Sequence, residues 1–182
     1  MTNLRKASSD SQLRVGFIGC GEIASYHADV LIALGCSIQA VSAKPGSKNI
    51  GKFISRYKNV AAYDSWNDMV VKQDLDALWV VASWNAIDDL LLPVLDCDLP
   101  IFFEKPVALS SAKLEMAVRI VNKRTNYIQV GYNRRFYSHI PKVRNYLKIH
   151  QPRSVFLEIP EVEPPETDPL SKYLLYQNSC HA

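Results

Sequence analysis

Short apolar runs alternate along the chain with stretches in which apolar residues recur at helical spacing. The first run, residues 13–18, is rich in β-branched residues, which is typical of a buried parallel strand. The runs cover residues 13–18, 37–42, 76–82, 100–103 and 127–130. Because helical stretches separate them, the pattern predicts an α/β fold with a doubly wound parallel sheet. In such folds a ligand binds at the carboxyl ends of the strands.

The helical stretches have recognisable beginnings and ends. The first begins near residue 23 and carries apolar residues at helical spacing, namely Ile23, Tyr26, Val30, Ile32 and Leu34. Gly35 is expected to end it. Further helices are expected over residues 48–57, from Asp64 or Ser65, over 86–95, and after Ser110 or Ser111 as the cap. The buried face of the last is expected to carry Leu114, Ala117, Val118 and Val121.

Three regions of the chain differ in character. Residues 1–12 are polar and are interpreted as a disordered leader. Residues 13–137 carry the strand–helix alternation of a dinucleotide-binding Rossmann domain, and residues 138–182 are interpreted as the beginning of a truncated α+β domain. The third region has an amphipathic helix over 139–150, a lone strand over 154–159 and a proline-rich acidic loop over 161–169, with structure resuming over 173–181.

A glycine-rich turn separates the first strand from the first helix. Gly19 and Gly21 lack Cβ atoms, so the backbone can turn tightly and approach a pyrophosphate closely. Ala24 takes the third small position, where the helix packs on the strand. The first helical turn, which includes Glu22 and Ile23, offers N–H groups and a positive dipole end to phosphates. The turn therefore indicates a dinucleotide site; the alternative is a glycine turn without a ligand.

The end of the second strand bears on the choice of cofactor. An acidic residue here binds the ribose hydroxyls of NAD in Rossmann proteins. This chain has Ser42, Ala43 and Lys44 instead, with Lys48 further on. A lysine could pair with the 2′-phosphate of NADP. The pattern slightly favours NADP over NAD, with Ser42 and Lys44 at the adenosine ribose; the alternative is that the lysines are only solvated loop residues.

Composition and charge exclude several other classes of protein. The 182 residues carry a net charge of +3 with scattered lysines and arginines, which does not favour nucleic acid as a partner. No apolar run has the length of a signal peptide core or a membrane span, so a cytoplasmic protein is expected. The four cysteines are far apart, without the spacing of metal ligands, and are interpreted as reduced thiols.

Three motifs together resemble the glucose-fructose oxidoreductase/inositol dehydrogenase (Gfo/Idh/MocA) family of NAD(P)-dependent sugar oxidoreductases. They are residues 19–24 with His27 behind them, Glu104-Lys105-Pro106, and residues 131–136. The resemblance covers about residues 13–182. It implies a Rossmann domain followed by a larger α/β substrate domain on an open antiparallel sheet. Chains of that family are much longer, so this one is expected to be a fragment or a natural truncation.

The resemblance also assigns residues to the reaction. It places Lys105 by the nicotinamide and the substrate hydroxyl, with Glu104 at the same centre. His181 matches a second acid/base, although Gln177 stands where the family has an aspartate. The family often has a histidine where this chain has Asp88. From the strand ends, Ser83, Trp84 and Asn85 are expected to line the nicotinamide side, and Asn133 and Arg134 to contact the cofactor or fix the hinge between domains.

The implied function is hydride transfer between a nicotinamide cofactor and a hydroxyl or carbonyl group of a sugar or nucleotide sugar. This chain would be the cofactor-binding half and would bind cofactor without useful turnover on its own. A non-catalytic dinucleotide-binding or regulatory module is the alternative, which Gln177, Asp88 and the short chain favour. A homo-oligomer is expected, since an exposed half-sheet would need another surface to cover it. The identity of the sugar stays open, since it depends on the second domain.

Overall fold

A computed structural model describes the backbone of residues 12–154 and of residues 156 and 158. The chain forms two compact units, which divide between Gln129 and Val130. Each unit is described on its own. This division lies close to the domain boundary expected at residue 137, and the domain assignment itself stays a prediction.

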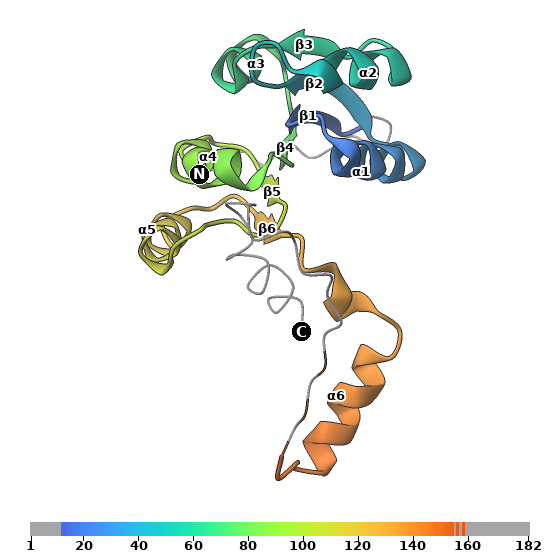
Figure 1. Ribbon diagram of the computed structural model, residues 1–182, viewed down its shortest axis with the longest axis vertical. Coiled ribbons are helices and arrows are strands. Elements are labelled where there is room, and N and C mark those ends of the chain that lie inside the picture. The colour runs from blue at the N-terminus through green and yellow to red at the C-terminus, as the bar shows by residue number, and fades with distance from the viewer. Residues whose placement is uncertain (1–11, 155, 157, 159–182) are drawn as a thin grey trace, which may run out of the picture. The chain divides into compact units, whose positions relative to one another are not determined.

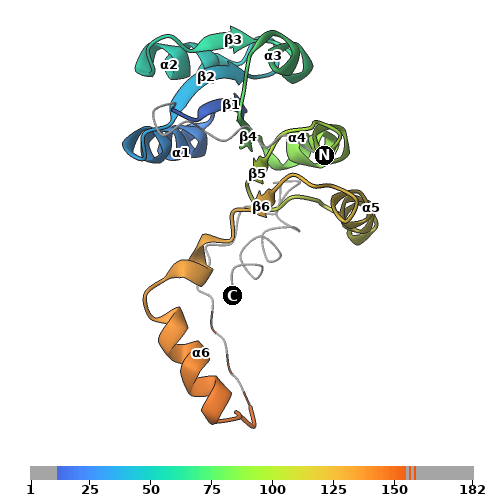
Figure 2. The ribbon, with the colours of Figure 1, turned by 180° about the vertical axis from the view of Figure 1, so that it is seen from behind.

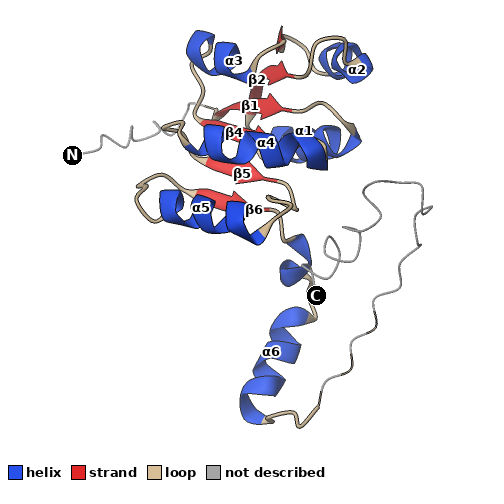
Figure 3. Cartoon of the chain, turned by 60° about the vertical axis from the view of Figure 1, so that its left-hand side comes forward, coloured by secondary structure: helices blue, strands red, loops and turns tan. Residues whose placement is uncertain are grey.

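The first unit is built on a sheet whose strand order is β3-β2-β1-β4-β5-β6 (Figure 3). The pairs β1–β2, β2–β3, β1–β4 and β4–β5 are parallel. The order reverses between β1 and β4, which makes this the topological switch point of the sheet. The strands are β1 (Arg14–Ile18), β2 (Ser37–Ser42), β3 (Ala61–Tyr63), β4 (Ala77–Val80), β5 (Ile101–Phe103) and β6 (Ile128–Val130).

Helices cover both faces of this sheet. Figures 1 and 2 show α1 and α2 on one face and α3, α4 and α5 on the other. Parallel strands require such crossover connections, because the chain must return to the same end of the sheet before each new strand begins. The predicted doubly wound fold is therefore confirmed. The helices are α1 (Glu22–Ala33), α2 (Lys48–Arg56), α3 (Trp66–Lys72), α4 (Trp84–Leu95) and α5 (Ser111–Val121).

The core between the sheet and α1–α2 contains an aromatic cluster. Phe17 of β1 and Phe53 of α2 are fully buried, with ring centroids 5.6 Å apart. Tyr57 lies 4.8 Å from Phe53 and donates its hydroxyl hydrogen to the carbonyl of Ser25 and to Asp29, both on α1. Aromatic side chains bury large areas, so this cluster fixes α2 against α1 and β1.

Two helices bury a different face from the one that their apolar residues suggest. On α1, Ile23, Tyr26 and Val30 are more than half exposed, whereas the buried residues are Ala24, Ala28 and Leu31. On α5, only Ala117 of the four expected core residues is buried, and Leu114 and Val118 are exposed. Helical spacing identifies a helix, but apolar residues on more than one side do not tell which side meets the sheet. Alanine on the packed side lets α1 approach the strands closely.

The second unit contains a 3-10 turn, η1 (Asn133–Phe136), and the helix α6 (Ile140–Ile149). The predicted helix is confirmed, and its apolar residues Val143 and Leu147 are exposed. Of the strand predicted over 154–159, the described residues 154, 156 and 158 belong to no strand. The segments 161–169 and 173–181 lie outside the described residues.

The part of the chain that the structure describes has neither a membrane-spanning helix nor a cluster of metal-binding side chains. No helix there is long and apolar enough to cross a membrane. Among the described residues, no group of three or more histidine, cysteine or acidic side chains is arranged to hold a metal ion.

A charged contact joins α4 to α5, which lie on the same face of the sheet. Lys113 of α5 donates to the Asp88 carboxylate at 2.5 Å and to its backbone carbonyl at 2.8 Å. The other carboxylate oxygen accepts the Leu109 N–H at 2.7 Å. Burial alone would raise the pKa of Asp88, but the hydrogen bonds from Lys113 and Leu109 outweigh it and hold this pKa below its ordinary value. Asp88 thus has a structural role in this chain.

This contact should make stability depend on pH. Since the pKa of Asp88 is lower in the folded state, its contribution is present above the unfolded pKa, about 3.9, and is lost as pH falls through the folded pKa. Asp88→Asn keeps an acceptor for Leu109 but loses the charged contact, so we expect it to lower the free energy of unfolding at pH 7 by about 1–2 kcal/mol.

Urea unfolding between pH 7 and pH 2 checks this expectation. The difference in unfolding free energy between wild type and Asp88→Asn should shrink as the pH falls. Asp89→Asn is the matched control, because Asp89 is the exposed neighbour on the same helix. A difference that stays constant down to pH 2 would contradict the role given to the carboxylate.

Candidate functional site

The carboxyl ends of four strands lie in one row across the sheet. Ile18 of β1 is paired in register with Ser42 of β2 on one side and with Val80 of β4 on the other. Val80 is in turn paired with Phe103 of β5. The residues that follow these four positions therefore meet at one edge of the sheet. This is the edge where doubly wound proteins bind ligands.

Backbone hydrogen bonds continue the row by one residue beyond the strands. The Gly19 N–H donates to the carbonyl of Ser42 at 2.8 Å. The Val81 N–H donates to the carbonyl of Ile18 at 2.8 Å, and the Glu104 N–H donates to that of Val80 at 2.9 Å. The first residue of each loop is thus held by the neighbouring strand, so the bases of these loops have fixed positions.

Gly19 is required by the fold itself. Its φ is +106°, a conformation that residues with a side chain rarely adopt. A Cβ atom at this position would lie 2.4 Å from the carbonyl oxygen of Val81, which belongs to the neighbouring loop backbone. Any larger residue would have to push the ends of β1 and β4 apart.

Gly21 is different, because nothing in the described fold requires glycine there. It is the N-cap of α1, with an extended backbone at φ −73° and ψ −176°. A Cβ atom at this position would have no heavy atom within 4 Å. Open space therefore lies beside the N-terminus of a twelve-residue helix, where free N–H groups and the helix dipole favour an anion.

The other residues of this helix start have distinct surroundings. Ala24 is fully buried, as the packing role of the third small residue requires. Ile23 is 51% exposed. The Glu22 carboxylate accepts a hydrogen bond from the Tyr26 hydroxyl at 3.0 Å, and this contact raises the pKa of Tyr26. The backbone of Glu22 and Ile23 thus remains suited to a phosphate contact.

The end of β2 buries one of the side chains expected at the cofactor. Ser42 is only 2% exposed, and its hydroxyl lies 3.5 Å from the carbonyl of Phe17 in the core. Helices cover both faces of the sheet, so this side chain is enclosed in the core, and its contact with the ribose stays a prediction. The Ser42 carbonyl accepts from Gly19 and so supports the glycine turn. Lys44, two residues on, is exposed at this edge.

The end of β4 leads directly into a second helix. Ser83 is the exposed N-cap of α4, with extended backbone. Trp84, the first residue of the helix, is half-buried, and Asn85 follows it. The backbone of these three residues lies next to the Val81 loop base, at the edge expected for the nicotinamide side.

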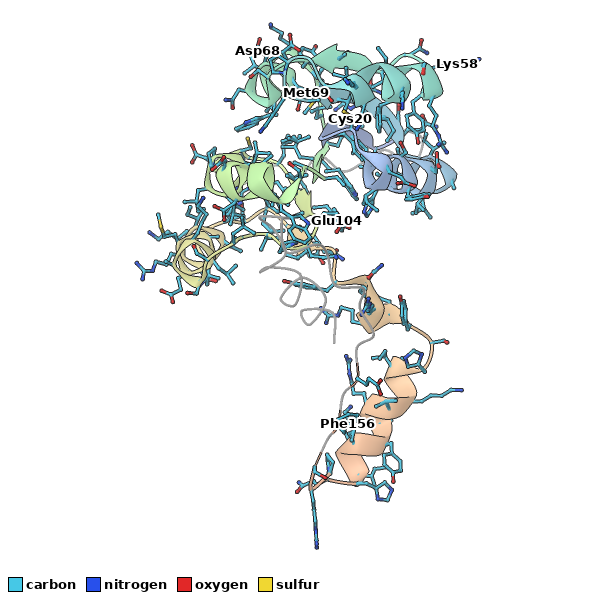
Figure 4. All side chains as sticks on the ribbon, in the orientation of Figure 1. Cys20, Lys58, Asp68, Met69, Glu104 and Phe156 are labelled. Atoms are coloured by element: carbon cyan, nitrogen blue, oxygen red, sulfur yellow. The ribbon has the colours of Figure 1, made fainter. Side chains whose placement is uncertain are left out.

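The end of β5 carries the Glu104-Lys105 pair, and Figure 4 marks Glu104 there. One carboxylate oxygen of Glu104 lies 2.9 Å from Nε2 of His27 on α1. The other accepts the backbone N–H of Lys105 at 3.0 Å. Lys105 is half-buried, and the peptide bond between Lys105 and Pro106 is cis. His27 was part of the first motif, but its contact with Glu104 spans 77 residues of sequence, and no local pattern could reveal it.

Three predicted site residues lie outside the described part of the first unit. Asn133 and Arg134 lie in η1 of the second unit, and His181 lies outside the described residues. Their proposed contacts with cofactor and substrate stay predictions.

A parallel sheet that reverses at β1, with a glycine turn and an open helix N-terminus there, defines a dinucleotide-binding Rossmann domain. Comparison with protein families agrees. Residues 13–132 match the model described as "Oxidoreductase family, NAD-binding Rossmann fold". The chain therefore belongs to the Gfo/Idh/MocA oxidoreductase family, as its motifs indicated.

Individual relatives fit this assignment. The uncharacterized oxidoreductase YrbE of Bacillus subtilis is 26% identical over 161 residues, which are 86% of this chain and 47% of that protein. The inositol 2-dehydrogenase/D-chiro-inositol 3-dehydrogenase of Lacticaseibacillus casei is 32% identical over 130 residues, which are 68% of this chain and 37% of that protein. The chain thus spans less than half the length of these curated relatives.

A solved structure gives the same result. The myo-inositol dehydrogenase from Lactobacillus casei, in complex with NAD(H) and myo-inositol, aligns with a TM-score of 0.68 and 27% sequence identity. The alignment covers 76% of this chain and 42% of that one. The fold of the first unit is therefore that of an NAD-binding oxidoreductase domain.

The contrast between the two glycines gives a direct test of the site. We expect Gly21→Val to leave the fold intact and to abolish NADH binding, because the branched side chain would fill the space that a pyrophosphate needs. Gly51→Val is the matched control: Gly51 is exposed on α2, with no heavy atom within 4 Å of its would-be Cβ. Titration calorimetry with NADH measures both variants, and circular dichroism confirms folding. Unchanged affinity in folded Gly21→Val would contradict the site.

Proposed function

We propose that this chain carries the cofactor-binding half of an oxidoreductase that transfers a hydride between a nicotinamide cofactor and a sugar, polyol or nucleotide-sugar substrate. The observation that supports it most is the convergence on one sheet edge of the open Gly21 turn and the Glu104-Lys105 pair. Membership of an NAD-binding oxidoreductase family supports the reaction class. The inositol dehydrogenases among the relatives support a polyhydroxylated substrate.

The residues present fit a dinucleotide. A Cβ atom at Gly21 would have no heavy atom within 4 Å, so the space beside the N-terminus of α1 is open to a pyrophosphate. The backbone of Gly21, Glu22 and Ile23 would hold the pyrophosphate at the positive end of α1. Lys44 would lie toward the adenosine ribose, and the backbone at Ser83 and Trp84 toward the nicotinamide. When bound, the nicotinamide accepts or returns the hydride.

Lys105 would move the proton that accompanies the hydride. Oxidation of a carbinol carbon requires its hydroxyl proton to leave, and a positioned amine within hydrogen-bond reach can accept it in the neutral form. Lys105 directly follows Glu104, whose carboxylate holds the Lys105 N–H. Glu104 therefore fixes the backbone from which this amine extends, and a fixed backbone leaves fewer conformations in which the amine is out of reach of the substrate.

Turnover by the longest polypeptide that the gene encodes tests this proposal. It would be assayed with NAD and NADP against inositols, sugars and nucleotide sugars, following reduced cofactor by absorbance. We expect Lys105→Ala to lower kcat by about 10²–10⁴-fold, the usual range for general acid–base catalysis, while the NADH dissociation constant stays within about threefold, because the pyrophosphate contacts are untouched. Lys123→Ala, at an exposed lysine after α5, is the control and should change neither value.

Two results would contradict the proposal. Turnover that survives Lys105→Ala would remove this residue from the reaction. Binding of NADH without turnover on any substrate of the panel would favour the alternative, a non-catalytic dinucleotide-binding module.

We further propose a preference for NADP over NAD. The supporting observation is that residues 42–48 contain no carboxylate and that Lys44 is exposed just beyond β2. A carboxylate there would repel the 2′-phosphate, whereas a lysine can pair with it.

The predicted self-association of the chain also stays a proposal.

The NADP preference is tested by removing one charge. One charge-assisted contact contributes about 1.5–3 kcal/mol, so Lys44→Ala should weaken NADPH binding at least about tenfold. NADH binding should change little, since NADH lacks the 2′-phosphate. Lys58→Ala, at another exposed lysine of the first unit, serves as the control. Equal losses for both cofactors, or tighter NADH binding by the wild type, would contradict the preference.

A further inference from the structure

His27 lies on α1, well beyond the first helical turn, and reaches across to the end of β5. Its Nε2 lies 2.9 Å from a carboxylate oxygen of Glu104. The side chains of His27 and Glu104 are 27% and 18% exposed. A hydrogen bond or ion pair that is largely shielded from water contributes more interaction energy than an exposed ion pair on the surface. It joins the helix that begins at the glycine turn to the loop that carries Lys105.

The Glu104 carboxylate uses both of its oxygens in defined contacts. One faces His27, and the other accepts the Lys105 N–H at 3.0 Å. A carboxylate only accepts hydrogen bonds, so Nε2 of His27 carries the hydrogen that it shares. Since the two oxygens belong to one rigid group, fixing one of them also fixes the direction of the other.

Aromatic side chains of β4 and β5 pack beside the His27 imidazole and hold it in place. The His27 ring lies 5.0 Å from the ring of Phe102, between centroids, at an interplanar angle of 57°. Phe102 of β5 is stacked on Trp79 of β4 at 5.1 Å. The imidazole is therefore oriented by packing on the sheet, in addition to its hydrogen bond.

We propose that His27 is a positioning residue for Lys105, acting through the Glu104 carboxylate. His27 fixes the rotamer of Glu104, and Glu104 in turn holds the backbone N–H from which the Lys105 side chain extends. The same helix, α1, offers its N-terminus to the pyrophosphate. The distance between the cofactor cradle and the reacting amine is thus set by one helix. This inference rests on the proposed function for its catalytic meaning.

Hydrogen exchange at the Lys105 amide reports on this arrangement without any turnover. Amide exchange measures local opening, and it can be followed by NMR on the ¹⁵N-labelled chain in the absence of cofactor. The Val81 amide, which donates to Ile18 at 2.8 Å, serves as an internal reference for the sheet. Titration with NADH on the same samples separately reports whether the cofactor site is intact.

Two substitutions separate the hydrogen bond from the ring packing. His27→Phe keeps an aromatic ring on Phe102 but removes the donor. His27→Gln loses the ring but can place an amide donor near the position of Nε2. We expect His27→Phe to raise the exchange rate of the Lys105 amide at least about tenfold, and His27→Gln to stay within about threefold of wild type. In a Glu104→Ala background, His27→Phe should add nothing, because the link between the two residues is already missing.

Each other outcome overturns the proposal. Unchanged exchange at Lys105 in His27→Phe would show that His27 does not hold this backbone. An equal rise in both variants would show that ring packing, and not the hydrogen bond, is what matters. An equal rise at Val81 would show that His27 only stabilises the fold. If the wild type fails to bind NADH, the proposed function fails, while the exchange data still decide whether His27 positions Lys105.

Discussion

The close approach of β1 and β4 at Gly19 is the constraint on which the site depends. The carbonyl of Val81 occupies the place where a side chain at Gly19 would begin, and φ there is +106°. Hydrogen bonds from the Gly19 N–H to β2 and from the Val81 N–H to β1 hold the two chain segments at this distance. The chain must therefore turn sharply at the switch point of the sheet, and α1 begins immediately afterwards, with its N-terminus at the ligand edge.

The same constraint gives the two glycines of the turn different roles. Gly19 is required by the backbone, whereas the space beside Gly21 is open, and we propose that a ligand uses it. Since α1 starts from a fixed point, His27 reaches Glu104 in a defined geometry, and the backbone at Lys105 is tied to the helix that faces the cofactor. In the proposed function, one rigid element would connect cofactor binding with proton transfer, and such preorganisation limits the reorganisation needed during reaction.

Much of this arrangement could be predicted from sequence, and the limits have physical causes. β2 was predicted at its observed bounds, because Ile38, Ala40 and Val41 form a short apolar segment directly after the helix stop at Gly35. β3 was missed, since two of its three residues are alanines, a residue type that is depleted in strands. The burial of Ser42 depends on strand register, and the contact between His27 and Glu104 depends on how α1 lies against β5. Such facts come from tertiary packing, which local periodicity does not contain.

The central claim is that a dinucleotide binds along the row of strand ends, beside Gly21. Titration of the ¹⁵N-labelled chain with NADH tests it most directly, by following the amide signals of each residue. The account predicts saturable shifts in the amides of residues 19–24, 43–44, 81–84 and 104–105, with those of α5 unchanged. Shifts confined to other segments, or no shifts at millimolar NADH, would contradict it.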